Sequence, residues 1–243
     1  MTTTPPGVRR AAKAVLRPLA GVVGSVTAVR TDAAQVVLTF DDGPEPGGTD
    51  RVLAALAERG ATATFFVLLT RVRRYRPLFE EVVAAGHEIA LHGIDHLPLT
   101  PFRPTEVQRR TAAGKAELED ALGRDVRWFR PPYGRQTWST WRAVRATGLE
   151  PILWGPSTLD WRDATPADRR AGVRGAARGS IVLAHDGFAG RIDGVDDGPA
   201  PVLDRGELIG QVLDDFAARG LVARSLGTVL ADGEPVRTIS FRR

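Results

Sequence analysis

The chain has 243 residues, of which 43% are hydrophobic and 26% are charged, a balance that excludes disordered, collagen-like and coiled-coil proteins. It contains no cysteine, which excludes disulfides, thiolate metal sites and cysteine catalysis. The formal charge is +4 and the isoelectric point is near 10.2. The arginines are scattered along the chain apart from one cluster, Arg71, Arg73, Arg74 and Arg76, and we expect all of them at the solvated surface. We therefore expect no nucleic-acid partner.

The first segment, residues 1–24, is basic and contains proline, and we expect it to form an arm or a helix outside the folded domain. It lacks the run of about 20 apolar residues that a transmembrane helix needs. Residues 26–28 would suit the cleavage site of a signal peptide. Residues 25–31 and 35–40, however, alternate like two strands joined by a turn, and cleavage would cut this predicted hairpin. We therefore expect a cytoplasmic protein, with secretion or the cell envelope as the alternative.

From residue 35 onward, short apolar runs alternate with helical patterns, as in proteins built on a parallel sheet or barrel. The predicted strands are residues 36–40, 62–68, 88–91, 126–129, 151–154, 180–184 and 221–225. Helices are expected at 50–59, 105–122 and 207–219, each followed by a glycine, and a long loop is expected at 186–206. These elements predict a single α/β domain over residues 25–232, a barrel of about seven parallel strands, with 233–243 as a C-terminal tail.

Acidic, histidine and arginine residues stand at or after the ends of five predicted strands. They are Asp41 with Asp42, His92 with His96, Arg130, Asp160, and His185. Because the carboxyl ends of parallel strands meet at one rim of a β/α barrel, we expect these side chains to converge. The sequence therefore predicts an active site at this rim.

The spacing of His92 and His96 places two imidazoles within reach of one metal ion, on a helical turn or a tight loop. Asp41 and Asp42 stand just before a Gly-Pro bend, where adjacent carboxylates can face one cleft and do different jobs. One carboxylate with two imidazoles leaves coordination positions open, as in catalytic zinc sites, and cobalt, nickel or manganese would also fit. His87 precedes a predicted strand, and we expect it to be structural.

Five ordered motifs resemble those of the polysaccharide deacetylase family, which has the NodB-homology domain and is also called carbohydrate esterase family four. The motifs are Thr39-Phe40-Asp41-Asp42-Gly43-Pro44, His92-Gly93-Ile94-Asp95-His96, Arg130-Pro131-Pro132-Tyr133-Gly134, Asp160-Trp161 and Leu183-Ala184-His185. The resemblance extends over about residues 25–230 and implies an incomplete (β/α) barrel of distorted TIM-barrel type. It also implies a divalent metal, usually zinc, and an N-acetylated sugar, oligosaccharide or glycan as substrate.

The resemblance further implies how the metal and the attacking water are handled. Asp42, His92 and His96 would hold the metal ion. Asp41 would be the base that takes the proton of the attacking water. Arg130 would pair with Asp41 and keep it charged and oriented.

The later motifs would act on the leaving group and the acyl group. His185 would be the general acid toward the departing amine, with Asp160 setting its tautomer and charge. The backbone N–H of Tyr133 would stabilise the oxyanion of the tetrahedral intermediate. The residues implied in substrate binding are Trp161 and Leu183, as walls of a pocket for the acetyl methyl, together with Pro132 and Tyr133.

Gly93 departs from the family pattern, in which Ser or Thr usually follows the first metal histidine. The missing hydroxyl predicts a less constrained loop between His92 and His96 and a more weakly held metal. Gly93→Ser is then expected to tighten metal binding, unless Gly93 has a positive φ that any side chain would strain.

The sequence thus predicts a metal-dependent hydrolase that removes the N-acetyl group from a sugar or glycan. Two alternatives differ from this prediction in the substrate or in the absence of turnover. The same machinery could act on an O-acetyl ester or a small non-sugar amide, or the chain could be a glycan-binding pseudoenzyme. The presence of every implied metal ligand and acid or base residue favours the enzyme.

Overall fold

A computed structural model describes residues 23–241 of the chain. Its centre is a sheet of seven parallel strands in the order β6-β5-β4-β3-β2-β7, with β8 paired to the first half of β2. These strands are β2 (Gln35–Asp41), β3 (Thr64–Leu68), β4 (Glu88–Gly93), β5 (Trp128–Phe129), β6 (Glu150–Pro151), β7 (Ile181–His185) and β8 (Val222–Arg224). Each predicted strand overlaps one of these, although the prediction for 151–154 shares only Pro151 with β6. Their parallel pairing confirms the predicted fold class.

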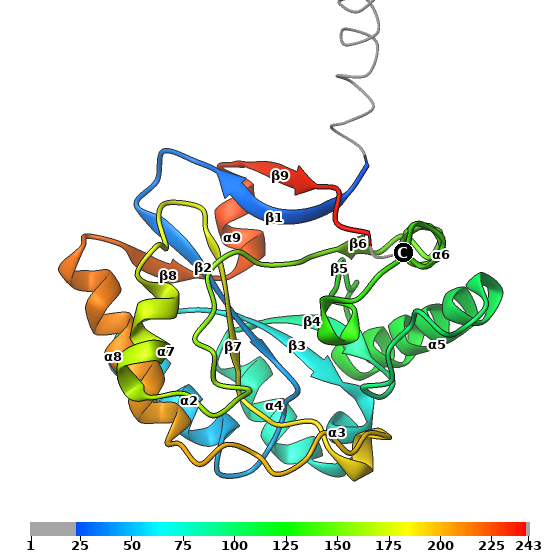
Figure 1. Cartoon of the computed structure of the whole chain (residues 1–243), viewed down its shortest axis with the longest axis horizontal. Helices are drawn as coiled ribbons and strands as arrows, with labels where there is room; N and C mark the ends of the chain where they lie inside the picture. Colours follow the sequence, from blue (N-terminus) through cyan, green and yellow to red (C-terminus); the bar gives the residue numbers. More distant parts are fainter. Residues whose placement is uncertain (1–22, 242–243) are drawn as a thin grey trace, which may run out of the picture.

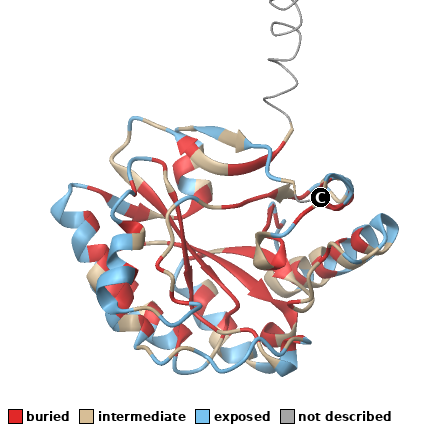
Figure 2. Ribbon diagram, in the orientation of Figure 1, coloured by how far each residue is buried: buried red, intermediate tan, exposed pale blue. Residues whose placement is uncertain are grey.

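Helices cover the outer side of this sheet (Figures 1 and 2). They are α2 (Thr49–Glu58), α3 (Leu69–Arg74), α4 (Arg76–Ala84), α5 (Pro104–Leu122), α6 (Trp138–Arg145), α7 (Pro166–Val173) and α8 (Arg205–Ala218). The three predicted helices are confirmed as α2, α5 and α8. Gly123 ends α5 in the left-handed conformation, with φ of 67°, and its N–H donates to the carbonyl of Glu119.

The strands of the sheet curve into a barrel that is not closed by a regular strand pair. Between β6 and β7 the chain after β6 lies along β7, where Gly155 N–H donates to Ile181 O and Leu183 N–H donates to Pro156 O. At the amino ends of the strands, α9 (Leu226–Ala231) contributes Leu226 and Val229 to the apolar barrel interior. The result is the incomplete barrel that the sequence predicts.

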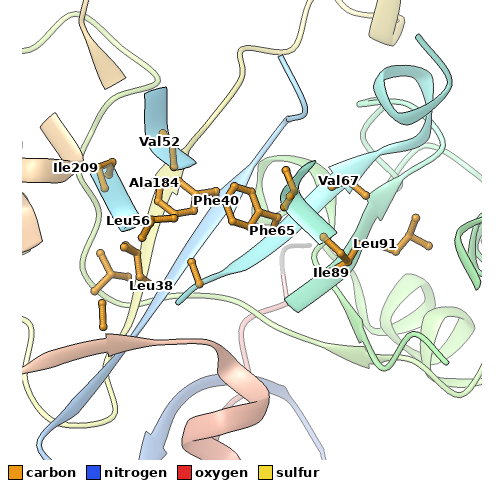
Figure 3. Close-up of a cluster of buried hydrophobic side chains, with 14 of the residues drawn as sticks. Leu38, Phe40, Val52, Leu56, Phe65, Val67, Ile89, Leu91, Ala184 and Ile209 are labelled. Atoms are coloured by element: carbon orange, nitrogen blue, oxygen red, sulfur yellow. The ribbon is translucent and has the colours of Figure 1, made fainter. Parts of the chain in front are cut away.

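Alternation along β2 divides its side chains between two apolar clusters. Val36, Leu38 and Phe40 face the helices and belong to the larger cluster, which is drawn in part in Figure 3. Val37 faces the barrel interior. Burying such a Leu or Phe side chain contributes about 1.5–3 kcal/mol, so this central strand is held firmly on both faces.

The predicted hairpin of residues 25–31 and 35–40 is wrong. Residues 25–30 do form a strand, β1 (Ser25–Arg30), but it pairs antiparallel with β9 (Glu234–Thr238), within the segment expected to be a tail. Both edges of β2 are already occupied by parallel neighbours, which leaves no edge for β1. Residues 1–22, where most of the predicted arm falls, lie outside the described residues.

The arginine cluster is only partly a surface feature. Arg73 and Arg76 are exposed and pair with Glu117 and Glu80, as expected for solvated arginines. Arg71 contradicts the expectation, because its side chain is 3% exposed and lies against acidic groups inside the protein. Within residues 23–241, no helix combines the length and the apolar composition that crossing a bilayer would require.

Candidate active site

Because side chains alternate between the two faces of a strand, certain polar residues of the barrel strands point into the barrel interior. Thr39 and Asp41 follow Val37 on the inward face of β2, and His92 and His185 lie at the carboxyl ends of β4 and β7. All four are buried. The carboxyl-terminal rim therefore gathers the groups that the sequence predicts there.

Asp42 should point away from Asp41 if the strand continued. Its φ of 74° breaks the extended conformation, and Asp is one of the residues that tolerates this region. The turn brings the Asp42 carboxylate to the same side as Asp41, with the two side chains only 7% and 4% exposed. The two adjacent carboxylates thus share one cleft, as predicted, but have different neighbours.

Asp42, His92 and His96 form a compact set of donor atoms. The Nε2 atoms of His92 and His96 each lie 3.4 Å from Asp42 Oδ1, and one ligand atom from each residue lies within 4.8 Å of the other two. His92 Nδ1 is 2.8 Å from the carbonyl oxygen of Arg130. With the proton on Nδ1 donated to that carbonyl, Nε2 keeps its lone pair for a ligand.

The polarity of this set fits a divalent cation. Asp42 Oδ1 is buried and accepts no hydrogen bond, an arrangement that is costly without a positive partner. Burial opposes its ionisation, but His96 and His92 lower the pKa of Asp42 below its ordinary value. One carboxylate and two imidazoles are the ligand types of catalytic zinc sites, so the residues present fit the predicted metal.

Asp41 has a different partner. Arg130 Nη1 donates to Asp41 Oδ1 at 2.6 Å and to Thr39 Oγ1 at 2.9 Å. The guanidinium lies over the ring of Phe66 at 4.0 Å, and its side chain is fully buried. One oxygen of Asp41 is therefore held by Arg130, while Oδ2 faces the metal-ligand set, 3.8 Å from His92 Nε2.

His185 and Asp160 form a buried pair on the other side of the cleft. Asp160 Oδ1 lies 2.7 Å from His185 Nδ1, and Asp160 Oδ2 accepts from the backbone N–H of His185 at 2.8 Å. Burial disfavours the imidazolium, but the charge and hydrogen bond of Asp160 outweigh it and raise the pKa of His185 to about 9. Arg205 Nη1 donates to the carbonyl of His185 at 3.0 Å and lies 3.5 Å from Asp160.

A cavity of ≈ 440 Å³ joins these groups, a size typical of small-molecule sites. The predicted site residues that line it are Asp41, Asp42, His92, His96, Tyr133, Trp161, Leu183 and His185. Arg130 and Asp160 lie behind this wall. Pro132 does not line the cavity but borders a much smaller space beside Gly93, so direct substrate contact is not supported for it.

The family model for polysaccharide deacetylase matches residues 28–152. The chain belongs to the polysaccharide deacetylase family. A chitooligosaccharide deacetylase of Azorhizobium caulinodans is 33% identical over 168 residues, covering 68% of this chain and 80% of that protein. A peptidoglycan-N-acetylglucosamine deacetylase of Bacillus cereus is 32% identical over 155 residues, covering 63% and 72%.

The fold is also shared with solved structures. A pseudoenzyme of carbohydrate esterase family four from Bacillus anthracis superimposes with a TM-score of 0.72 at 20% identity, over 84% of this chain and 68% of that one. At this identity the likeness concerns the fold alone. A fold by itself does not determine activity, which depends on the residues of the site.

Gly93 is where this member departs from the deacetylase pattern, and the structure explains how the loop is braced without a hydroxyl. The two carboxylate oxygens of Asp95 each lie 2.7 Å from Arg110 Nη2, and Leu97 N–H donates to Asp95 Oδ1 at 3.2 Å. Gly93 has φ of +159°, and a Cβ there would lie 2.5 Å from the carbonyl oxygen of Asp95. The expected benefit of Gly93→Ser is therefore wrong.

We now expect Gly93→Ser to weaken zinc binding by about 10-fold or more, because the new Cβ displaces the chain between His92 and His96 and misaligns both imidazoles. Gly93→Ala should weaken it similarly, since the clash is made by Cβ. Zinc titration of the metal-free proteins measures this. Gly86→Ala is the control, because Gly86 also has a positive φ but an added Cβ there meets nothing within 4 Å. Tighter binding by the Ser variant would contradict the steric argument.

Two residues that support this deacetylase site were not assigned a role from the sequence. Thr39 accepts a hydrogen bond from Arg130. Because Thr39 stands two residues before Asp41 on a strand, strand periodicity alone places both side chains on the same face. Arg205 holds the His185–Asp160 pair from the first turn of α8. An arginine at a helix start resembles many surface arginines, so no local pattern identifies it.

Proposed function

We propose that this protein is a metal-dependent hydrolase that removes the N-acetyl group from an N-acetylated sugar or glycan. The observation that carries the proposal is the division of labour at one cavity. Asp42 faces two imidazoles, Asp41 faces Arg130, and His185, paired with Asp160, lines the same cavity. This is the set that amide hydrolysis needs: a metal site, a base and an acid.

Asp42, His92 and His96 would hold a divalent ion such as Zn²⁺, which when bound would act as a Lewis acid on the acetyl carbonyl and make water nucleophilic near neutral pH. Asp41 accepts the proton of the attacking water through Oδ2, because Oδ1 is held by Arg130. The Tyr133 backbone N–H donates to the developing oxyanion.

The remaining residues act on the leaving group and the acyl group. His185 donates its proton to the departing amine nitrogen, and Asp160 keeps the imidazole charged and oriented for that step. Leu183, which is 2% exposed, and Trp161 supply apolar surface for the acetyl methyl at the cavity wall. An apolar wall next to a polar centre favours acetyl over charged acyl groups.

The names of the relatives support an N-acetylated glycan as the substrate class, since they are deacetylases of chitooligosaccharide and of peptidoglycan N-acetylglucosamine. The test is acetate release by the zinc-loaded protein from N-acetyl chitooligosaccharides, with O-acetylated xylooligosaccharides as the comparison. Release from the chitooligosaccharides supports the proposal. Release from the O-acetyl ester alone would assign an esterase, and zinc binding without release from either would favour another acyl substrate.

We expect His92→Ala to lose bound zinc and acetate release while remaining folded, because it removes one of the three ligands and leaves the strand backbone in place. Metal content after dialysis and circular dichroism measure the two effects. His87→Ala is the matched control, since His87 is also buried but packs on Phe65 away from the cavity. Stoichiometric zinc in the His92 variant would contradict the assignment of His92 as a metal ligand.

A further inference from the structure

We propose that Arg71 is a positioning residue that holds two metal ligands, Asp42 and His96, in place through the chain segment 186–197. The inference rests on the proposed function, because it concerns the metal site of that reaction. Arg71 lies on α3, and the segment that it holds includes the short helix η2 (Arg191–Asp193), which packs beside α3 (Figure 1).

Arg71 makes more polar contacts than a structural ion pair requires. Its Nε and Nη2 donate to Asp193 Oδ2 at 3.0 and 2.8 Å, and Nη2 also donates to the carbonyl of Phe188 at 2.6 Å. Nη1 lies 2.7 Å from Glu45 Oε1. The side chains of Arg71 and Asp193 are 3% and 0% exposed. This is the planar fork geometry for which arginine cannot be replaced by lysine.

One path leads from Arg71 to His96. The carboxylate of Asp193, fixed by Arg71, also accepts from Thr70 Oγ1 at 2.7 Å and from Gly190 N–H at 3.0 Å. The backbone carbonyl of the same Asp193 accepts from the N–H of His96 at 2.9 Å. The position of the second imidazole ligand is therefore tied to the residue that Arg71 grips.

A second path leads to Asp42. Glu45, which pairs with Arg71, accepts from the N–H of Phe188 at 2.9 Å. The next residue, Ala189, donates its N–H to Asp42 Oδ2 at 3.3 Å. This bond holds one oxygen of Asp42 and leaves Oδ1 facing the two imidazoles. Both paths thus start at one guanidinium and end on metal ligands that follow two different strands, β2 and β4.

Stability alone is a poor explanation for this buried network. Desolvating several charges is expensive, and apolar side chains of similar volume often stabilise a fold as well or better. A network of short directional bonds instead fixes positions. Ligand orientation is what such outer contacts control in metal sites, where their loss typically weakens binding about 10–100-fold.

The test compares Arg71→Lys with Arg73→Lys by zinc titration of the metal-free proteins. Arg73 is on the same helix and also forms a two-bond pair, but it is exposed and its bonds go to Glu117 rather than to the segment 186–197. Lysine keeps the charge and loses the fork. We expect the zinc Kd to rise about 10–100-fold for Arg71→Lys and to stay unchanged for Arg73→Lys.

A purely structural role would give a different pattern. It would lower the unfolding temperature of Arg71→Lys without changing the zinc Kd of the folded protein. Asp193→Asn is the second variant, for use if Arg71→Lys does not fold, because the amide has the shape of the carboxylate and the backbone carbonyl that His96 uses is unchanged. It is expected to raise the Kd as well. For both variants, the kcat measured at saturating zinc should lie closer to the wild-type value than the activity measured at limiting zinc does.

A folded variant of either residue with the wild-type zinc Kd would overturn this inference alone. A wild-type protein that binds no zinc would instead contradict the proposed function, and this inference with it. The two failures are therefore distinguished by the wild-type titration.

Discussion

Replacing Asp41 by Asn is expected to lower kcat by about 10²–10⁴-fold while leaving zinc bound, because only the acceptor of the water's proton is removed. The amide has the shape of the carboxylate and can still accept from Arg130 through its oxygen. Arg130 keeps its bond to Thr39 and its contacts with the carbonyls of Ile152 and Leu153, so the barrel should tolerate the change. Acetate release at saturating zinc gives kcat, and titration gives the zinc Kd.

The neighbouring carboxylate provides the contrast. Asp42→Asn is expected to weaken zinc binding strongly, because an amide oxygen is neutral and Asp42 Oδ1 is the atom that both imidazoles face. Its activity should be partly restored by excess zinc, whereas the activity of the Asp41 variant should not. Equal loss of zinc by the two variants would show that the division of labour between the two carboxylates is wrong.

The second large effect is expected from Asp160→Asn, which should lower kcat by about 10²–10⁴-fold and move the alkaline limb of the pH profile to lower pH. The sign follows from His185. Its pKa is raised to about 9, so the imidazole is protonated and able to donate below that pH and loses its proton as the pH rises through it. Removing the charge of Asp160 removes the largest of the attractions that raise the pKa of His185, so this pKa falls.

Orientation contributes to the same loss. The two oxygens of Asp160 accept from the ring Nδ1 and from the backbone N–H of His185, and an amide can satisfy only one of these donors. The pH dependence of kcat/KM at saturating zinc measures the shift. Asp163→Asn is the control, because Asp163 is exposed in the segment that follows Asp160. An alkaline limb that stays in place would show that another group supplies the proton.

The sequence alone determined much of this architecture because the relevant patterns are local. Short apolar runs that alternate with helical patterns located the seven strands, and glycines located the ends of α2, α5 and α8. Once the strands are known to be parallel, their carboxyl ends must meet, so the polar residues after them were expected at one rim. The motifs of the family then supplied a role for each of these residues.

The tertiary structure decided what depends on contacts between distant segments. The pairing of β1 with β9 joins residues about 200 positions apart, and local alternation carries no information about a partner. The bend after Asp42 let the sequence predict that Asp41 and Asp42 face one cleft, but only the structure shows the φ of 74° by which Asp42 leaves the strand direction. Arg71 and Arg205 look like surface arginines in sequence, and they are buried because acidic groups from distant loops surround them. Whether a charged side chain is buried, and which group pairs with it, depends on the folded chain and cannot be inferred from a short stretch of sequence around it.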